Sequence, residues 1–338
     1  MWSENQLDER LSCPTEQLIR DMEELDGDIM ILGAGGKVGP TLSVMAKRTS
    51  DLCGKKRNVY AVSRFTDPYV VALLEKENVT TITADLSDEA QLQKLPKVPN
   101  VIYMLGRKFG TCENACETWA TNVGVPAMVT RHFGAARYVV FSTGNVYPFS
   151  STSSAGCDES VSPEPVGEYG MSSLGRERIF EYAARHYGAS VLIYRLNYAV
   201  DLRYGVLFDL AQKIRNGEPI SVKVPAFNCV WQHYANEVAL RSLLHATPAV
   251  EYLNVTGPET IFVRDVARKL AEAMGCAVVF EGEEGTKALL SNSQKCIRLF
   301  GYPSIGVEEM LRLQAQWVMG GGRKLGKPTH FEESEGKF

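Results

Sequence analysis

The chain has 338 residues, of which 45% are hydrophobic and 22% charged, and a formal net charge of -4 at pH 7. This composition predicts a soluble folded protein with one large domain or two unequal ones. The slightly acidic balance gives no indication of a basic surface for nucleic acid or anionic membrane, and from the sequence we expect no signal peptide and no membrane-spanning segment. The eight cysteines form no CxxC pair, which favours reduced thiols, a cytoplasmic protein and no metal site.

The first stretch with a chemical meaning is a glycine-rich turn after an apolar run at residues 28–32. Before it, apolar residues at helical spacing predict an amphipathic helix over residues 14–26 within an N-terminal arm, residues 1–27. After it, a helical pattern begins at about Thr41. Glycine lets the backbone approach a pyrophosphate at a helix N-terminus. The turn therefore predicts dinucleotide binding, although a turn without a ligand is the alternative; its residues are Gly33, Gly35, Gly36, Lys37, Val38 and Gly39.

The end of the second predicted strand, residues 58–62, bears on the choice of cofactor. A carboxylate there accepts hydrogen bonds from the ribose of NAD, whereas the phosphorylated ribose of NADP requires a cation. This chain has Ser63 and Arg64 at that point, and Lys37 in the turn is a second cation. The pattern favours NADP, with NAD as the alternative, and solvated surface charges are the competing interpretation.

Further strands at residues 79–83, 101–104 and 138–142 alternate with helical segments. This alternation predicts a doubly wound parallel α/β sheet of Rossmann type, in which ligands bind beyond the carboxyl ends of the strands. The residues that follow these strands are Asp85 and Leu86, then Leu105, Gly106 and Lys108, and then Thr143 and Asn145. A later strand at residues 191–194 is followed by Leu196 and Asn197.

The second half of the chain predicts a smaller mixed α/β substrate domain, residues 201–225 and 247–318, with residues 28–200 and 226–246 in the Rossmann domain. We expect substrate contacts at the seam between the domains. The candidates are Asn145, Arg203, Tyr204 and Trp231. Asn236 is predicted to cap a helix. The tail, residues 319–338, is rich in Gly, Lys and Glu, which predicts a mobile extension; folding back over a site is the alternative.

From about residue 28 to residue 318 the chain resembles the extended short-chain dehydrogenase/reductase superfamily, in particular the NAD(P)-dependent sugar epimerases and dehydratases related to UDP-galactose 4-epimerase. The resemblance implies a homodimeric enzyme with a small, carbohydrate-derived substrate. It also implies roles for single residues: Gly33, Gly36 and Gly39 at the pyrophosphate, Asp85 and Leu86 at the adenine, Leu105, Gly106, Lys108 and Asn122 at the cofactor, Leu196 and Asn197 at the nicotinamide, and Thr143 and Tyr169 in catalysis.

The resemblance fails at one position of the catalytic motif YxxxK, where Ser173 follows Tyr169 in place of lysine. A phenol has an ordinary pKa of about 10, so without a neighbouring cation it is a poor base but can still donate a proton to a ketone under reduction. Lys108 and Arg176 are candidates to replace the lysine, and a surface or dimer-interface ion pair is the alternative for Arg176. Gly144 and Asn145 stand where dehydratases have an Asp-Glu pair, which disfavours dehydration. Loss of catalysis, leaving a cofactor-binding sensor or scaffold, is the alternative function.

Overall fold

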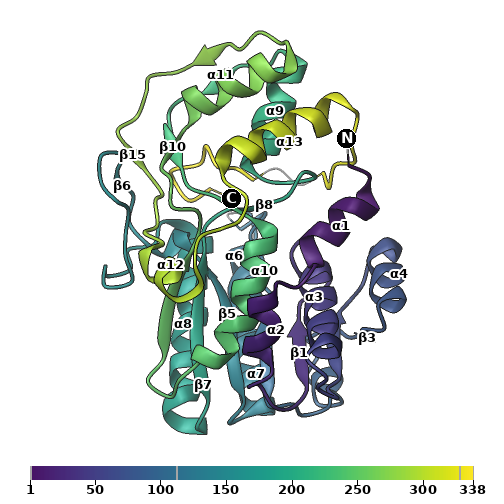
Figure 1. Ribbon diagram of the computed structural model, residues 1–338. Helices are drawn as coiled ribbons and strands as arrows, with labels where there is room; N and C mark the ends of the chain where they lie inside the picture. Colours follow the sequence, from purple (N-terminus) through teal and green to yellow (C-terminus); the bar gives the residue numbers. More distant parts are fainter. Residues whose placement is uncertain (1, 112, 327–328, 338) are drawn as a thin grey trace.

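The computed structural model describes residues 2–111, 113–326 and 329–337. A large lobe is built around a seven-stranded sheet, and a smaller lobe containing α9 (Val206–Asn216), α11 (Val263–Met274) and α13 (Val307–Met319) lies above it in Figure 1. None of the helices in this part of the chain is long and apolar enough to cross a membrane. Among the described cysteines all are free thiols, and Cys112 lies outside the described residues.

The large sheet is parallel throughout, with the strand order β12-β7-β5-β4-β1-β2-β3. The direction of winding reverses between β1 and β4, and the crevice at such a switch point is where doubly wound sheets bind ligands. This confirms the predicted Rossmann-type fold. The strands are β1 (Ile29–Leu32), β2 (Val59–Ser63), β3 (Thr80–Thr83), β4 (Asn100–Tyr103), β5 (Arg137–Thr143), β7 (Ser190–Leu196) and β12 (Glu251–Val255).

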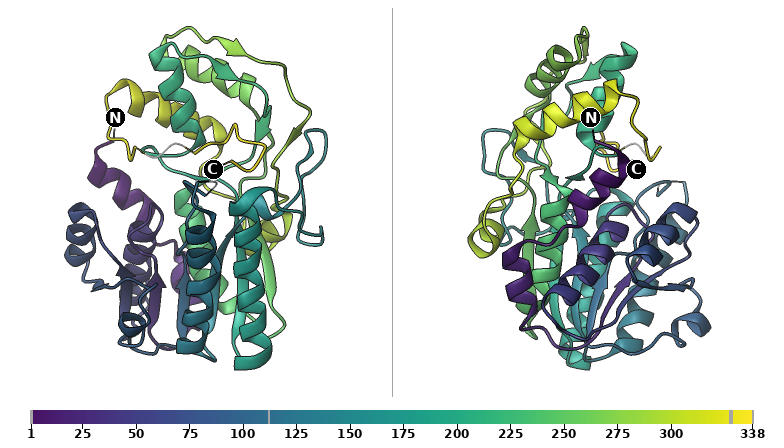
Figure 2. Two further views of the ribbon diagram at one scale, coloured as in Figure 1. Left: turned by 180° about the vertical axis from the view of Figure 1, so that it is seen from behind. Right: turned by 45° about the vertical axis from the view of Figure 1, so that its right-hand side comes forward.

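Helices cover both faces of the sheet (Figure 2), because alternate residues of each buried strand point to opposite sides. Ile29 and Ile31 of β1 pack in a core with one helical layer, while Met30 and Leu32 pack in a second core with the other. The first layer contains α2 (Glu16–Met22), α3 (Gly39–Leu52), α4 (Pro68–Lys76) and α10 (Gln232–Arg241); the second contains α5 (Glu89–Leu92), α7 (Val125–Phe133) and α8 (Gly167–Tyr187). Between β4 and α7 lie α6 (Ala115–Trp119) and a π-helix (Ala120–Gly124).

The smaller lobe has its own apolar core between α9, α11 and α13. Each of these helices buries one apolar stripe; α11, for example, buries Val266, Leu270 and Met274. Short strands accompany them in pairs: β8 (Ala199–Val200) with β11 (Val230–Trp231), β9 (Ile220–Ser221) with β14 (Phe280–Glu281), β10 (Ala226–Phe227) with β13 (Ile261–Phe262), and β6 (Ser150–Ser151) with β15 (Lys287–Ala288). The helix α12 (Gln294–Phe300) contributes to the first core of the large lobe.

Two expectations about elements were wrong, and one helix was not predicted. The strand β12 pairs with β7 in the large sheet, so residues 251–255 do not belong to a separate substrate domain. An unpredicted helix, α1 (Glu4–Ser12), packs Leu7 and Leu11 into the core of the smaller lobe. The helix α10 begins at Gln232, which places Asn236 in its interior, where the side chain donates to the Leu11 carbonyl and to Thr41 Oγ1.

The described part of the tail is packed against the protein. Thr329 and Phe331 are buried, and the Phe331 ring lies 6.0 Å from that of Phe227 in the smaller lobe. Lys213 of α9 donates to Glu332 at 2.7 Å. The C-terminal segment thus returns to the region between the lobes (Figures 1 and 2), and the predicted mobile extension was wrong. The alternative, a tail that folds back, is what the structure shows.

Candidate active site

A cleft opens at the carboxyl ends of β1, β4 and β5 and has two connected parts. The larger part, of about 840 Å³, extends toward β2 and β3, and the smaller part, of about 370 Å³, extends toward α8 and the smaller lobe. The two parts share Gly33, Gly36, Gly106 and Lys108 among their lining residues. The glycine turn therefore lies at the middle of one continuous cleft.

The glycines of the turn have different reasons to be glycine. Gly33 has φ +87°, and a Cβ atom there would lie 2.8 Å from the Leu105 backbone nitrogen. A Cβ on Gly39 would lie 2.4 Å from the Ala34 carbonyl oxygen, and one on Gly35 would lie 2.6 Å from Ser63 Oγ. At Gly36 the nearest atom would be 3.4 Å away, so this residue faces open cleft. Gly36 is thus the position at which a ligand can approach the backbone.

The start of α3 completes an anion site beside this turn. The helix begins at Gly39, its N-cap residue Val38 makes no side-chain capping hydrogen bond, and Pro40 occupies its first turn. Free backbone N–H groups and the helix dipole at such a terminus favour a phosphate group. The residues present therefore fit the pyrophosphate of a dinucleotide, which is the ligand that the turn predicts.

The larger part of the cleft contains the residues predicted to contact the adenosine: Ser63, Arg64, Asp85, Leu86 and Leu105. Arg64 is an exposed rim residue, with its guanidinium 3.9 Å from Asp85. Hydrogen bonds from Ser87 hold the pKa of Asp85 below its ordinary value. Lys37 does not join this group, because it lines the smaller part of the cleft. The two cations that favoured NADP therefore line different parts of the cleft.

Thr143 and Tyr169 meet in the smaller part of the cleft. Thr143 is the last residue of β5 and is 7% exposed; its hydroxyl donates to Asn145 Oδ1 at 3.0 Å and accepts from the Asn145 backbone N–H at 3.2 Å. Tyr169 lies in the first turn of α8. Asn145, Val38, Leu196 and Asn197 line the same space. The side-chain amide of Asn197 donates to Asn228 Oδ1 at 2.7 Å and to the Leu289 carbonyl at 3.2 Å, which fixes its orientation.

Arg176 lines the cleft and makes no ion pair with the residues that the structure describes. Its guanidinium donates to the Phe141 carbonyl at 2.9 Å and to Asn122 Oδ1 at 2.8 Å, and it packs against Gly106. Its neighbour Glu177 instead pairs with Arg195 at 2.7 Å. The interpretation of Arg176 as a surface residue was therefore wrong, and the guanidinium forms part of the cleft floor. Ser173, the residue in place of the lysine, is buried and its hydroxyl has no hydrogen-bond partner among the described residues.

Asn122 positions the loop after β4 and does not line either part of the cleft. It lies in the π-helix, a local distortion that is common at functional sites. Its side-chain oxygen accepts from the Arg107 N–H at 2.8 Å, and its amide donates to the Arg107 carbonyl at 3.0 Å. The predicted direct contact with a cofactor was wrong for Asn122. The two hydrogen bonds between Asn122 and the Arg107 backbone instead hold Gly106 and Lys108 at the cleft.

Two lysines reach the smaller part of the cleft from opposite loops. Lys108 Nζ donates to the Thr329 carbonyl at 3.1 Å and lies 5.9 Å from the centroid of the Tyr169 ring. Burial lowers the pKa of Lys108 to about 8, although Asp209 opposes the shift. Lys37 Nζ lies over the Tyr204 ring, 2.9 Å from its centroid.

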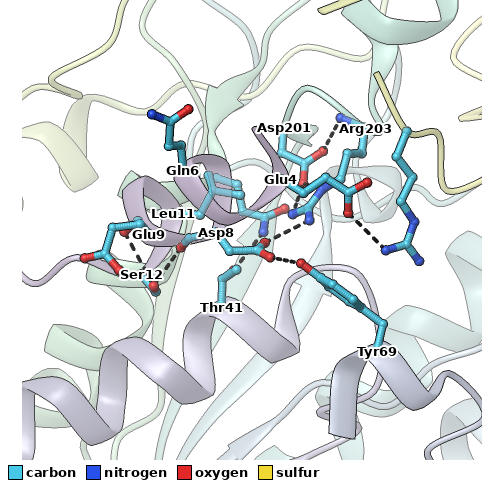
Figure 3. A network of polar contacts seen from close by, with 12 residues as sticks. Glu4, Gln6, Asp8, Glu9, Leu11, Ser12, Thr41, Tyr69, Asp201 and Arg203 are labelled. Carbon is cyan, nitrogen blue, oxygen red and sulfur yellow. Dashed lines mark hydrogen bonds and ion pairs between the residues drawn. The ribbon is translucent and has the colours of Figure 1, made fainter. Parts of the chain in front are cut away.

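Arg203 and Trp231 do not line the cleft, so the prediction of substrate contacts was wrong for both. Arg203 is buried in a network with Asp201 and with Asp8 of α1, each 2.8 Å away, and the Tyr69 hydroxyl also donates to Asp8 (Figure 3). Trp231 is 2% exposed and packs in the core of the smaller lobe, where its ring meets that of Trp2 edge-on. Tyr204, next to Arg203, does line the cleft as expected.

The residues around the smaller part of the cleft that sequence reasoning missed include Phe109, Tyr198 and Thr329, which line it, and Asp209, which lies behind Thr329. The Thr329 N–H and hydroxyl donate to Asp209 Oδ2 at 2.7 and 2.6 Å, and burial raises the pKa of that carboxyl. Tyr198 has φ +48°, a strained backbone that is found most often at functional sites. Tyr198 could have been predicted as a site residue, because it directly follows Asn197 in the sequence. Nothing in the sequence near Thr329 indicates a site. Within the described residues, no group of three or more His, Cys, Asp or Glu side chains could hold a metal ion.

Known structures share this fold at low sequence identity. MoeE5 in complex with UDP-glucose and NAD is 19% identical, with a TM-score of 0.69 over 87% of this chain and 99% of that one. UDP-glucuronic acid 4-epimerase from Bacillus cereus, in complex with UDP-glucuronic acid and NAD, is 15% identical, with a TM-score of 0.71 and the same coverage, 87% and 99%. UDP-glucose 4-epimerase from Thermotoga maritima is 18% identical, with a TM-score of 0.69, again over 87% and 99%. At these identities the likeness concerns the fold.

Comparison with protein families gives a direct assignment. The model of the NAD dependent epimerase/dehydratase family matches residues 29–255, more than half of the chain, from β1 through β12. A comparison with curated proteins finds no match. The family match confirms the resemblance drawn from the glycine turn, Thr143 and Tyr169, and with it the enzyme class. The chain belongs to the NAD-dependent epimerase/dehydratase family.

Proposed function

We propose that the protein is an NADP-dependent oxidoreductase or epimerase that acts on a sugar or sugar-derived substrate. The supporting observation is that Thr143 and Tyr169 line one small space together with Gly36 of the glycine turn. A dinucleotide bound at that turn would supply hydride chemistry at a carbinol or ketone carbon of the substrate. Solved structures of the same fold contain NAD and UDP-sugars, which is consistent with a carbohydrate substrate.

Tyr169 is the proton donor or acceptor in this proposal, and Thr143 is its partner. When a ketone is reduced, the phenol gives its proton to the substrate oxygen while the threonine hydroxyl donates a second hydrogen bond to the same oxygen. In the structure the threonine hydroxyl donates to Asn145 Oδ1 at 3.0 Å and accepts from the Asn145 N–H at 3.2 Å. Donation to the substrate oxygen would replace the first of these hydrogen bonds, while the Asn145 N–H would continue to hold the hydroxyl oxygen.

Lys108 is the cation that we propose in place of the missing lysine. Its ammonium lies 5.9 Å from the Tyr169 ring centroid, where a positive charge stabilises the negative charge that develops on the phenol oxygen. Arg176 is tied to the Phe141 carbonyl and to Asn122 on the cleft floor. We propose that Arg176 positions Gly106 and the loop that carries Lys108.

Arg64 supports the choice of NADP. The last residue of β2 is Ser63 and the next is Arg64, so neither position carries a carboxylate, and Arg64 lines the larger part of the cleft beside Ser63, where a phosphorylated ribose would meet the guanidinium. The dissociation constants of NADPH and NADH, measured by fluorescence for the wild type and Arg64→Gln, test this choice. Tighter NADH binding by the wild type would identify NAD as the cofactor.

We also propose a homodimer formed through α8. This helix has 21 residues and exposes Met171 and Tyr182 on its surface. Sedimentation or light scattering of the purified protein measures the mass directly. A monomeric mass at micromolar concentration would contradict the proposal, and disruption by Tyr182→Glu would support it.

The second candidate function is a catalytically impaired cofactor-binding sensor or scaffold, which Ser173 at the lysine position favours. The purified protein with NADPH and a panel of sugars, sugar acids and nucleotide sugars separates the two functions. For the enzyme, we expect substrate-dependent NADPH oxidation or epimerisation that Tyr169→Phe abolishes and the matched surface variant Tyr182→Phe preserves. Cofactor binding without turnover on the whole panel would favour the sensor or scaffold.

A further inference from the structure

A carboxylate of the smaller lobe lies directly behind one wall of the cleft. Asp209 is in the first turn of α9, where the helix dipole stabilises a negative charge. Its Oδ2 accepts from the Thr329 N–H at 2.7 Å and from the Thr329 hydroxyl at 2.6 Å. Thr329 lines the smaller part of the cleft, whereas Asp209 does not. Asp209 therefore holds a wall residue from behind and does not itself face the cleft.

Thr329 joins this carboxylate to Lys108. While its N–H and hydroxyl donate to Asp209, its carbonyl accepts from Lys108 Nζ at 3.1 Å. These hydrogen bonds all involve a charged group, which makes them stronger than bonds between neutral groups. Thr329 is 0% exposed, so its peptide is held between the two charged side chains. The contacts thus run from α9 in the smaller lobe, through the C-terminal segment, to the loop after β4 in the large lobe.

The C-terminal segment also contacts the helix that carries Tyr169. We call residues 329–336 the C-terminal strap. Gly336, at its end, packs against Gly167 in the first turn of α8, so closely that a Cβ atom on Gly167 would lie 2.3 Å from the Gly336 carbonyl oxygen. Tyr169 follows two residues later in the same helix. One short segment therefore touches both the proposed cation, Lys108, and the helix of the proposed proton donor.

The charges around Thr329 indicate how the carboxylate acts on Lys108. Burial lowers the pKa of Lys108 to about 8, and the charge of Asp209 opposes this shift. Burial also raises the pKa of Asp209, while the hydrogen bonds from Thr329 favour its ionised form. Other titratable groups that face this pair among the described residues are Lys37, Lys213, Tyr169, Tyr198 and Tyr204.

We propose that Asp209 is a positioning residue of the reaction, which acts through Thr329 to hold the charged Lys108 ammonium beside Tyr169. This proposal rests on the proposed function, since it takes from there the catalytic role of Lys108. It makes the smaller lobe and the C-terminal strap parts of the device that places the cation. The rival interpretation is that Asp209 only fastens the strap to α9. Glu332 provides the comparison, because it also fastens the strap to α9, through Lys213 at 2.7 Å.

The experiment compares Asp209→Asn with the matched control Glu332→Gln in the full-length protein. Asparagine keeps an oxygen that accepts from Thr329 but removes the charge. Single-turnover oxidation of bound NADPH by an active carbonyl substrate should be about tenfold slower in Asp209→Asn, with the Kd of NADPH unchanged. Glu332→Gln should react at the wild-type rate, because the Lys213 pair lies outside the cleft.

The pH profile of the same reaction separates positioning from fastening. Loss of the Asp209 charge removes support for the Lys108 ammonium, so the alkaline fall of the rate should move to lower pH in Asp209→Asn. In a Lys108→Arg background the same change should leave the alkaline limb in place, because a guanidinium stays protonated. Glu332→Gln should have the wild-type profile.

A double-mutant cycle in urea unfolding at pH 7 tests the link without a substrate. The loss of stability caused by Asp209→Asn should be smaller in Lys108→Met than in the wild type, because the partner of the carboxylate is already gone. Coupling in this cycle, together with no turnover on any substrate, would contradict the proposed function alone.

Several results would overturn the role of Asp209. Additive losses in the cycle would show that the carboxylate and Lys108 are not linked. An unchanged rate and alkaline limb in Asp209→Asn would remove its effect on the reaction, and an equal slowing by Glu332→Gln would reduce it to a fastener of the strap. A faster reaction in Asp209→Asn would show that the contact with Thr329 restrains Lys108 and inhibits the enzyme.

Discussion

Replacing Lys108 by methionine tests the proposed catalytic cation. The 5.9 Å from its ammonium to the Tyr169 ring centroid gives an interaction of about 3 kcal/mol between unit charges at an effective dielectric constant of about 20. If that interaction is present only when charge develops on the phenol oxygen, its loss lowers kcat by about a hundredfold. The assay is single-turnover oxidation of bound NADPH with an active carbonyl substrate, so that product release does not limit the rate.

Two controls separate this effect from a general loss of structure. Lys108→Arg keeps the charge and should keep most of the activity, whereas Lys213→Met removes a lysine that pairs with Glu332 outside the cleft and should leave kcat unchanged. A Lys108→Met enzyme with kcat within about threefold of wild type would refute the electrostatic argument.

The pH dependence of the rate gives an independent test of Lys108. Burial lowers the pKa of Lys108 to about 8, so its ammonium is charged below that pH and loses its proton as the pH rises through it. The wild-type rate should therefore begin to fall at about pH 8 or above, and Lys108→Arg should shift this fall to higher pH. Equal alkaline limbs in wild type, Lys108→Arg and Lys108→Met would assign the titration to another group.

The remaining predictions concern the glycine turn and the network of α1. Gly39→Ala should destabilise the protein by about 1–3 kcal/mol in urea unfolding, because its Cβ atom would lie 2.4 Å from a carbonyl oxygen, whereas Gly36→Ala should unfold like wild type but bind NADPH more weakly. Equal stability of the two variants would contradict the different roles of the two glycines. Asp8→Asn should lower the free energy of unfolding by about 1.5–3 kcal/mol, because it weakens a buried charged contact with Arg203, and the exposed Glu9→Gln should cost less than about 1 kcal/mol. Equal losses from Asp8→Asn and Glu9→Gln would show that burial of the Arg203 network is unimportant.

The parts of the fold that local pattern determines were predictable. A continuously apolar run such as residues 29–32 predicts a buried parallel strand, whichever strands it pairs with. Gly33 and Gly39 indicate close backbone contacts around the turn. Thr143 was found because it lies at the end of an apolar strand, and Tyr169 because its surroundings resemble the YxxxK motif of the family. The seven-stranded sheet follows from the repetition of such units.

The predictions that failed concern residues whose positions depend on contacts between distant parts of the chain. The direction of the Lys37 side chain is set by Tyr204, which lies far along the sequence, and not by the turn that contains it. The burial of Arg176 depends on carbonyl and amide oxygens of β5 and the π-helix. In the tail, a polar composition concealed Phe331, a single aromatic residue with a place in a distant core. Composition averages over a segment, whereas one well-packed side chain is enough to dock it.

The packing of residues 329–337 between the lobes has a consequence for the order in which the protein folds during synthesis. Synthesis runs from the N-terminus, and the sheet that surrounds the glycine turn is complete with β12 at Val255. Thr329, which lines the smaller part of the cleft, comes later in the sequence than every strand of that sheet. A nascent chain can therefore assemble the larger part of the cleft while one wall of the smaller part does not yet exist. The glycine turn can thus be held in place before the wall at Thr329 is synthesised.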